Sequence, residues 1–198
     1  MPDMDDFFTS GRTLENERAR LEPLTNAHLG LLWPIAVQKE IWEFTTAKIA
    51  TEQEFELYFN QALSEQEQSL SIPFAIYDKK FERYAGSTRY GNISIPHKRL
   101  EVGWTWYEPA LQRTGLNRSC KFLLLKHAFE VCNMNRVELK TSLTNLKSQA
   151  AIGKIGATKE GILRNHIIND DGTLRHSVIF SIIKEEWPEI RNTIFREY

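Results

Sequence analysis

EVGWTWYEPALQRTGLNRSCKFLLLKHAFE, residues 101–130, is the stretch on which the predicted fold depends. Its first part, Val102 to Tyr107, is rich in aromatic and β-branched residues and favours a strand, which Pro109 ends. From Leu116 onward, apolar residues recur at steps of about three and four, which is the spacing of an amphipathic helix. The stretch therefore predicts a strand, a short polar turn and a long helix in succession.

The turn between this strand and this helix has the features of a phosphate-binding site. The first amides of a helix have no partner inside the helix, and the helix dipole adds positive potential there. Gln112–Asn117 therefore offers several backbone N–H donors, while Arg113 and Arg118 add positive charge. A glycine such as Gly115 also occurs in turns that bind nothing, so the turn alone leaves its function open.

The rest of the chain alternates between strand-like and helix-like segments. Thr51 and Glu54 have the spacing of a capping box, which predicts the start of a helix. Asn169–Gly172 separates two alternating segments and predicts the turn of a β-hairpin. Strands are expected at Arg12–Glu22, Ser71–Asp78, Tyr84–Ile95, Glu101–Tyr107, Arg136–Thr141, Thr158–Ile168 and Leu174–Ile183, and helices from Ala27, at Thr51–Glu67, from Leu116, at Asn145–Ile155 and at Glu185–Glu197. These elements predict an α/β (α+β) fold with a central, mostly antiparallel sheet flanked by helices.

Length, charge and hydropathy exclude several classes of protein. The 198 residues fit one domain over 1–198, in which residues 1–11 are expected to form a flexible arm. The net charge of −1 lacks the positive excess that a protein needs to bind nucleic acid through a general basic field. The acidic N-terminus is not typical of a signal peptide, and no apolar run is long enough to span a membrane.

The two cysteines do not predict a disulfide or a metal site. Cys120 and Cys132 lie on the same predicted helix, about 18 Å apart at about 1.5 Å per residue, which is too far for a disulfide. Two lone cysteines also do not make a set of metal ligands. We therefore expect a reduced, cytoplasmic protein without a metal.

Two motifs connect the chain with a known family. Gln112–Asn117 (QRTGLN) is similar to the pyrophosphate loop of the GCN5-related (GNAT) N-acetyltransferases, whose general pattern is Gln/Arg-x-x-Gly-x-Gly/Ala. Asn117 departs from the small last residue, although a T-G-x-N turn occurs in the RimJ/RimL-like subgroup. Asn145–Gly161 (NLKSQAAIGKIGATKEG) resembles the N-x-x-S-x-x-A-I-x-x-x-G-A-x-x-E-G stretch of that subgroup. Leu163–Arg164 and Glu186–Pro188 match it as well, so the resemblance covers most of the domain.

The resemblance implies transfer of an acetyl group from acetyl-CoA to a primary amine, by direct attack without a covalent enzyme intermediate. It also implies two splayed parallel strands, Glu101–Tyr107 and Arg136–Thr141, along which the amide-rich pantetheine arm pairs as a strand does. It thereby assigns cofactor binding to Trp104, Thr105, Gln112, Arg113, Thr114, Gly115, Leu116, Asn117 and Asn145. The acceptor stays open between a protein N-terminus and a small amine, and so do a longer acyl donor such as succinyl-CoA and a homodimer.

Two residues are candidates for the chemistry itself. Ser148 follows Asn145 on the same face of the helix, and its hydroxyl could stabilise or protonate the leaving CoA thiolate. The alternative is that Asn145 caps the helix and Ser148 is a polar surface residue. The resemblance places a carboxylate near Glu101 as the base that takes the amine proton, directly or through water. The alternative for Glu101 is an exposed carboxylate at the end of a strand.

Histidines and the first helices complete the sequence-based expectations. His127 is expected to pack in its helix, whereas His166 and His176 lie near the hairpin and could face the acceptor. The helical part Ala27–Glu67 and the turn Asn169–Gly172 are expected to shape the acceptor site. Two other functions stay open: a non-catalytic CoA-binding or protein-interaction module on the same fold, and a nucleotide-phosphate binder that uses the glycine turn alone.

Overall fold

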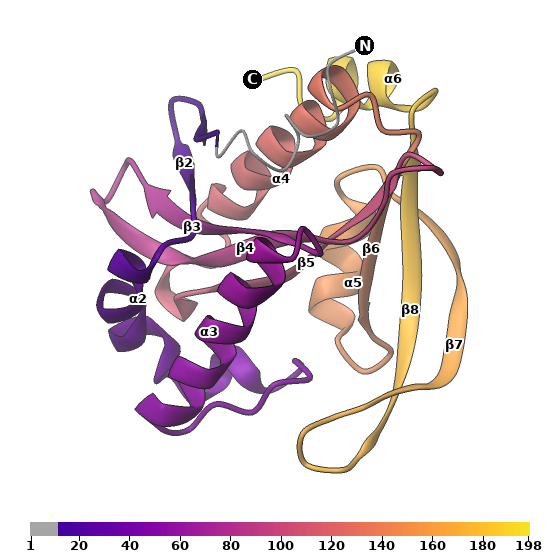
Figure 1. The fold of residues 1–198 in the computed structure, drawn as a ribbon. Coiled ribbons are helices and arrows are strands. Elements are labelled where there is room, and N and C mark those ends of the chain that lie inside the picture. Colours follow the sequence, from indigo (N-terminus) through magenta and orange to yellow (C-terminus); the bar gives the residue numbers. More distant parts are fainter. Residues whose placement is uncertain (1–11) are drawn as a thin grey trace.

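The computed structural model describes residues 12–198, so the arm expected over residues 1–11 lies outside the described part. The strands are β1 (Leu14–Glu15), β2 (Ala19–Pro23), β3 (Ile72–Asp78), β4 (Arg83–Ser94), β5 (Arg99–Tyr107), β6 (Arg136–Ser142), β7 (Thr158–Ile168) and β8 (Leu174–Ile183). They form an eight-stranded sheet in the order β1-β2-β3-β4-β5-β6-β8-β7 (Figure 1). β5 and β6 are parallel, and the other neighbouring pairs are antiparallel, which confirms the predicted fold class.

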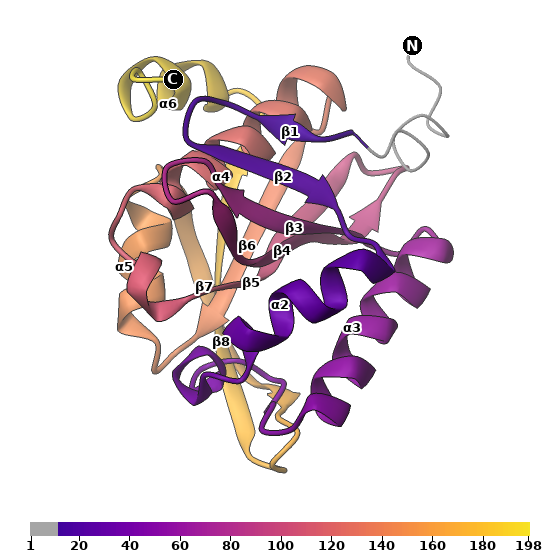
Figure 2. The same ribbon diagram turned by 90° about the vertical axis from the view of Figure 1, so that its left-hand side faces the viewer.

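Helices pack on both faces of this sheet. The α-helices are α2 (Leu29–Ala36), α3 (Glu52–Glu67), α4 (Leu116–Lys126), α5 (Leu146–Gly153) and α6 (Trp187–Thr193). Short helical turns add η1 (Asn26–His28), η2 (Lys39–Trp42), η3 (Pro109–Leu111) and the π-helical η4 (His127–Val131). α4, α5 and α6 share one buried apolar cluster, while α2 and α3 belong to a second one. Along β3, Phe74 and Ile76 belong to the first cluster and Ala75 to the second, so the clusters lie on opposite faces of the sheet. Figure 2 shows α4 on one side of the central strands and α2 and α3 on the other.

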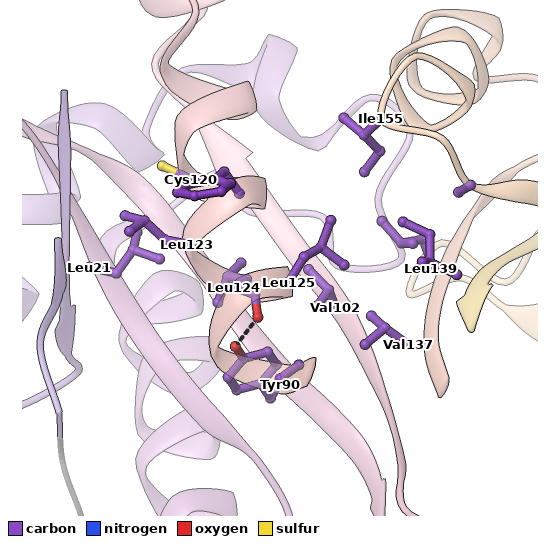
Figure 3. Close-up of a cluster of buried hydrophobic side chains, with 14 of the residues drawn as sticks. Leu21, Tyr90, Val102, Cys120, Leu123, Leu124, Leu125, Val137, Leu139 and Ile155 are labelled. Atoms are coloured by element: carbon purple, nitrogen blue, oxygen red, sulfur yellow. Dashed lines mark hydrogen bonds between the residues drawn. The ribbon is translucent and has the colours of Figure 1, made fainter. Parts of the chain in front are cut away.

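The larger cluster fixes α4 against the middle of the sheet. Figure 3 shows Leu124 and Leu125 of α4 lying over Val102 of β5 and Val137 of β6. Each of these side chains is at most 2% exposed, and burial of a side chain of this size contributes about 1.5–3 kcal/mol. The Tyr90 hydroxyl donates a hydrogen bond of 2.6 Å to the Leu124 carbonyl oxygen. These contacts therefore hold the C-terminal half of α4 against the middle of the sheet.

The first strand differs from the prediction. Arg12–Glu22 was expected to be one strand, but the Asn16 side chain turns the chain and divides it into β1 and β2. Its Oδ1 accepts hydrogen bonds from the backbone N–H groups of Arg18 at 3.0 Å and Ala19 at 2.9 Å, as in an Asx turn. The last helix is also shorter than expected, because α6 covers only the middle of Glu185–Glu197.

The described residues hold two free thiols, with Cys120 buried and Cys132 half-buried. Over residues 12–198, no helix combines the length and the apolar character that crossing a membrane requires. No group of three or more His, Cys, Asp or Glu in that part of the chain has an arrangement that could hold a metal ion.

Candidate functional site

The parallel strands β5 and β6 separate after a short ladder. The ladder consists of the Cα partners Arg99 with Arg136, Leu100 with Val137 and Glu101 with Glu138. β5 continues to Tyr107 and β6 to Ser142, but past Glu101 the two strands share no ladder. Because an opened strand edge presents main-chain donors and acceptors, an amide-rich chain can add to it as a further strand. The splay implied by the resemblance is therefore present, at the expected strands.

A β-bulge shapes the open part of β5. Between the paired residues Gly103 and Trp106, the two residues Trp104 and Thr105 face the single residue Thr88 of β4. Trp104 has a φ of 49°, in the left-handed region that non-glycine residues rarely adopt. Bulges of this kind often lie beside functional sites, where they redirect side chains. Here the bulge coincides with the splay.

The indole ring of Trp104 lies on the α3 face of the sheet. A Cβ atom added at Gly91 would be 2.4 Å from the ring atom Cζ3, so the ring occupies the space that any other residue at position 91 would need. The guanidinium of Arg89 lies 5.5 Å from the ring centroid, and its Nη1 is 3.0 Å from Glu65 of α3. The Trp104 side chain is 37% exposed. This ring is therefore a half-open aromatic surface beside the splay.

Thr105 points to the other face, towards α4. Its Oγ1 accepts a hydrogen bond of 3.0 Å from Nζ of Lys121 and shares one of 2.7 Å with the Thr88 hydroxyl. Lys121 is buried, and this burial lowers the pKa of its ammonium group to about 8. The side chain of Thr105 is thus engaged in the core, so only its backbone is free for a ligand.

The turn after β5 has the backbone of an anion site. Arg113 has a φ of 62° and Gly115 a φ of 88°, and α4 begins directly afterwards at Leu116. A Cβ added at Gly115 would meet nothing within 4 Å, so conformation rather than space favours glycine there. The Thr114 hydroxyl donates to the Leu111 carbonyl oxygen at 2.7 Å, which closes the turn. The first amides of α4 therefore lie at an exposed turn, as predicted.

The other predicted residues of this turn divide between core and surface. Gln112 and Arg113 are exposed, whereas Leu116 is fully buried in the core and offers only its amide. Oδ1 of Asn117 accepts a hydrogen bond of 3.1 Å from the Tyr107 hydroxyl. An asparagine in place of the small residue of the general pattern thus ties the start of α4 to the end of β5.

The charges around the turn differ from the prediction. Nε of Arg118 donates to Oε1 of Glu197 at 2.6 Å, so this arginine points towards the C-terminal segment rather than into the turn. Arg18 of the β1–β2 turn takes its place, with Nη2 at 3.4 Å from the Thr114 hydroxyl oxygen. Its Nη1 forms an ion pair with the buried Asp78. Arg18 could not be identified from the sequence, because 96 positions separate it from Thr114.

Asn145 and Ser148 lie at the start of α5, just after β6. The Asn145 Oδ1 accepts a hydrogen bond of 2.9 Å from the Ser148 backbone N–H, so Asn145 is the N-cap of the helix. This confirms the alternative for Asn145, although its amide NH₂ remains without a hydrogen bond within residues 12–198. The Ser148 hydroxyl likewise makes none there, and the side chain is half-buried rather than fully on the surface.

Glu101 is buried, so the alternative of an exposed strand-end carboxylate is wrong. The residue is 5% exposed, and its Oε2 accepts hydrogen bonds from Asn92 Nδ2 at 2.7 Å and Lys140 Nζ at 3.0 Å. Its Oε1 lies near Gly103, where an added Cβ would be 3.0 Å away, and accepts no hydrogen bond within residues 12–198. One carboxylate oxygen is thus fixed by two donors, while the other is left beside the bulge.

Glu101 lines a cavity of about 650 Å³ on the face of the sheet opposite α4. The charged residues that line it are Arg99, Glu101, Arg136, Glu138, Lys140 and Glu160. They form ion pairs with one another, and the hydrogen bond from Arg136 lowers the pKa of Glu160 to about 2. His166 lines the cavity too, and burial together with the charge of Lys140 lowers its pKa. His176 instead accepts a hydrogen bond of 2.8 Å from the Asn165 backbone within the hairpin.

The hairpin turn and the segment after η2 meet beyond this cavity. The backbone N–H of Asp170 donates to the Thr46 carbonyl oxygen at 3.2 Å, and the backbone N–H of Lys48 donates to the Asp170 carboxylate at 3.3 Å. The sequence predicts that Asn169–Gly172 and the part Ala27–Glu67 shape the acceptor site, and the structure brings these two segments into contact.

Comparison with known proteins found relatives of this chain. Residues 18–158 match the model of the "Acetyltransferase (GNAT) domain" family. "Putative ribosomal N-acetyltransferase YdaF" of Bacillus subtilis (strain 168) is 28% identical over 96 residues, which are 48% of this chain and 51% of that protein. The match thus spans about half the length of that curated relative.

Solved structures agree with the family model. A GCN5-related N-acetyltransferase from Brucella melitensis is 25% identical, with a TM-score of 0.86 over 94% of this chain and 85% of that one. RimL, the ribosomal L7/L12 α-N-protein acetyltransferase, is 15% identical and shares the fold, with a TM-score of 0.77 over 87% of this chain and 94% of its own. The match over residues 18–158, more than half of the sequence, shows that the chain belongs to the GNAT acetyltransferase family.

Proposed function

We propose that the protein transfers an acetyl group from acetyl-CoA to a primary amine. The observation that carries this proposal is the end of the β5–β6 ladder at Glu101, followed by a glycine turn at the start of α4. An open strand edge next to a set of free helix amides suits a ligand with an amide-rich arm and a pyrophosphate. A nucleotide without such an arm would leave the edge unused.

In this proposal, residues of the turn and of the two strands bind acetyl-CoA. The backbone of Gln112–Asn117 receives the pyrophosphate, with Arg18 beside Thr114 as a further positive charge. The open β6-facing edge of β5 around Trp104 and Thr105 pairs with the pantetheine amides. The free amide NH₂ of Asn145 lies at the end of β6, where it can donate to the same arm.

Acetyl-CoA supplies an acyl thioester, whose transfer leaves a thiolate. The Ser148 hydroxyl, in the first turn of α5, is the proposed donor to this thiolate, because it is half-buried and makes no other hydrogen bond within residues 12–198. Oε1 of Glu101 is the proposed acceptor of the amine proton through water, since it faces the bulge without a donor of its own. No residue of the chain has to form a covalent intermediate.

The acceptor is proposed to enter on the α3 face, through the cavity that Glu101 and His166 line. The relatives named for ribosomal proteins support a protein N-terminus as the acceptor, although a small amine would fit the same chemistry. The N-terminal amine is mostly protonated at neutral pH, so either acceptor requires loss of a proton before attack.

The experiment compares ligands before it measures turnover. Acetyl-CoA should raise the melting temperature, whereas ATP and NAD should not, because only a ligand that binds the native state stabilises it. Equal shifts from all three would contradict the CoA assignment. Release of CoA in the presence of a panel of primary amines then separates an enzyme from a non-catalytic CoA-binding module. Binding of acetyl-CoA without release, over the whole panel, would show the module instead.

A further inference from the structure

Arg175 of β8 lies on the face of the sheet that carries the cavity. Along this strand, Val178 and Phe180 point into the apolar cluster of α4 and α5, while Ile179 between them lines the cavity. Successive side chains of a strand alternate between the faces. Arg175 and Ser177 therefore share the face of Ile179, on the acceptor side.

Arg175 has no carboxylate partner, unlike the other buried or half-buried arginines of this face. Arg89 pairs with Glu65, and Arg136 pairs with both Glu138 and Glu160. Within residues 12–198, no acidic group lies within salt-bridge distance of Arg175, and its Nε is buried without a hydrogen-bond partner. The Arg175 guanidinium thus has no carboxylate in direct contact inside the described chain.

Ser177, two positions further along β8, also has a buried polar atom without a partner in the described chain. Its side chain is 0% exposed, and its Oγ is buried without a hydrogen-bond partner in the described part of the chain. Buried polar groups in folded proteins are nearly always hydrogen-bonded, and an unmade bond costs about 1–3 kcal/mol. Two such donors, Nε–H of Arg175 and Oγ–H of Ser177, follow one another on the same face of one strand.

Arg175 itself is half-buried, so a ligand anion could reach the accessible part of its guanidinium and compensate its charge. An arginine stays protonated in proteins, so it keeps its charge even where it is partly withdrawn from water. Burial lowers the pKa of the Arg175 guanidinium, and the charge of Glu101 opposes this effect, which places the two side chains in one electrostatic neighbourhood. The planar fork of an arginine binds a carboxylate through two parallel hydrogen bonds. An anion at Arg175 would therefore lie close to the proposed proton acceptor.

We propose that Arg175 binds a carboxylate of the acceptor, so that the preferred acceptor is a primary amine with a carboxylate near its amino group. The inference rests on the proposed function for the position of the amine. Two sources share this chemistry: the carboxylate of a free amino acid, and an acidic side chain next to a protein N-terminus. Arg175 is thus a specificity-determining residue for an acidic acceptor.

The test compares acids with their amides in wild type and Arg175→Met. One pair is a C-terminally amidated peptide that begins Ser-Glu and its Ser-Gln counterpart; the other is a free amino acid and its amide. A charge-assisted hydrogen bond is worth about 1.5–3 kcal/mol, so kcat/KM for the preferred acid should fall about 10- to 100-fold, and by less than about 2-fold for its amide. The pair that responds identifies the source of the carboxylate. Arg196→Met, which removes an exposed arginine without an ion pair in the described chain, should change acid and amide equally.

Equal losses for acid and amide in Arg175→Met would overturn the inference, and so would no loss at all. Binding of the acids and amides to the enzyme, measured by calorimetry without acetyl-CoA, gives a second readout. If no amine is acetylated but the acid binds more tightly than its amide and loses affinity in Arg175→Met, the proposed function fails while the carboxylate site stands. If acid and amide bind wild type equally, the carboxylate site fails. Arg175→Lys keeps the positive charge but lacks the planar guanidinium, and it replaces Arg175→Met if the methionine variant is too unstable to assay. The loss of kcat/KM in this variant should again be larger for the acid than for its amide.

Discussion

Replacing Lys121 by methionine should stabilise the protein at pH 7. Lys121 is 7% exposed, and its burial lowers the pKa of the ammonium group from 10.5 to about 8. Because one unit of difference between folded and unfolded pKa corresponds to about 1.4 kcal/mol, the buried charge costs folding about 3 kcal/mol at pH 7. The substitution also removes the hydrogen bond to Thr105, which contributes about 1 kcal/mol. A net gain of about 2 kcal/mol follows.

The pH dependence distinguishes this cause from a general packing effect. The folded pKa lies below the unfolded one, so between pH 8 and 10.5 the unfolded state binds more protons than the native state. The cost of the buried charge is therefore complete below pH 8 and disappears as the pH rises to 10.5. Methionine does not titrate. The advantage of the variant should fall through this window, and near pH 10.5 wild type should be the more stable by about 1 kcal/mol, since it keeps the hydrogen bond.

Urea unfolding of wild type and Lys121→Met from pH 7 to pH 10.5 measures this difference. Comparison at each pH cancels the other titrating groups, because both proteins contain them. The matched control is Lys126→Met, which replaces an exposed lysine of the same helix and should give a difference that does not change with pH. A difference for Lys121→Met that is constant from pH 7 to pH 10.5 would refute the reasoning, since a buried ammonium with a lowered pKa cannot produce it.

Three further predictions concern the site. Gly115→Val should abolish binding of acetyl-CoA in calorimetry, because a β-branched residue resists the φ of 88° that shapes the turn and its side chain blocks close approach of the phosphate. The loss of fold should be small, because a Cβ added at position 115 meets no atom within 4 Å. Unchanged affinity would place the phosphate-binding turn elsewhere. Ser148→Ala should lower kcat about 10- to 1000-fold and leave the Kd for acetyl-CoA nearly intact, because charge develops on sulfur only during transfer. An unchanged kcat where chemistry limits turnover would remove Ser148 from the mechanism. Glu101→Gln should lower kcat/KM, by a factor that shrinks from about pH 6 to 9.5 as the amine deprotonates unaided. A constant factor would mean that Glu101 only positions the substrate.

The parts of the fold that depend on near neighbours could be predicted from the sequence. The expected helix Thr51–Glu67 is α3, and Thr51 and Glu54 form the predicted capping box. The hairpin of β7 and β8 has the expected bounds, because alternation and the turn residues between the strands are both local signals. The glycine turn before α4 could be predicted as well, because glycine favours the left-handed conformation that Gly115 adopts there.

The parts that depend on distant contacts could not be predicted. Arg118 looked like a charge for the phosphate turn, but Glu197, which is 79 positions away, holds it elsewhere. Glu101 was predicted as the candidate base, but its hydrogen bond with Lys140 could not be, because it depends on the register between β5 and β6. No sequence pattern pointed to Arg175, because its lack of a hydrogen-bond partner becomes visible only when distant segments come together on one face of the sheet.

The positive charges of the acceptor face bear on proton transfer as well as on specificity. Lys140 and Arg175 lie in the electrostatic neighbourhood of Glu101, and both act on His166, whose pKa burial and Lys140 lower. A nearby like charge disfavours the protonated form of an amine, so an ammonium that enters beside them loses its proton more readily. The carboxylate of an acidic acceptor would by itself raise the pKa of its own amine, and pairing with Arg175 would compensate this effect. The same arginine would then bind the acid and keep its amine able to lose the proton.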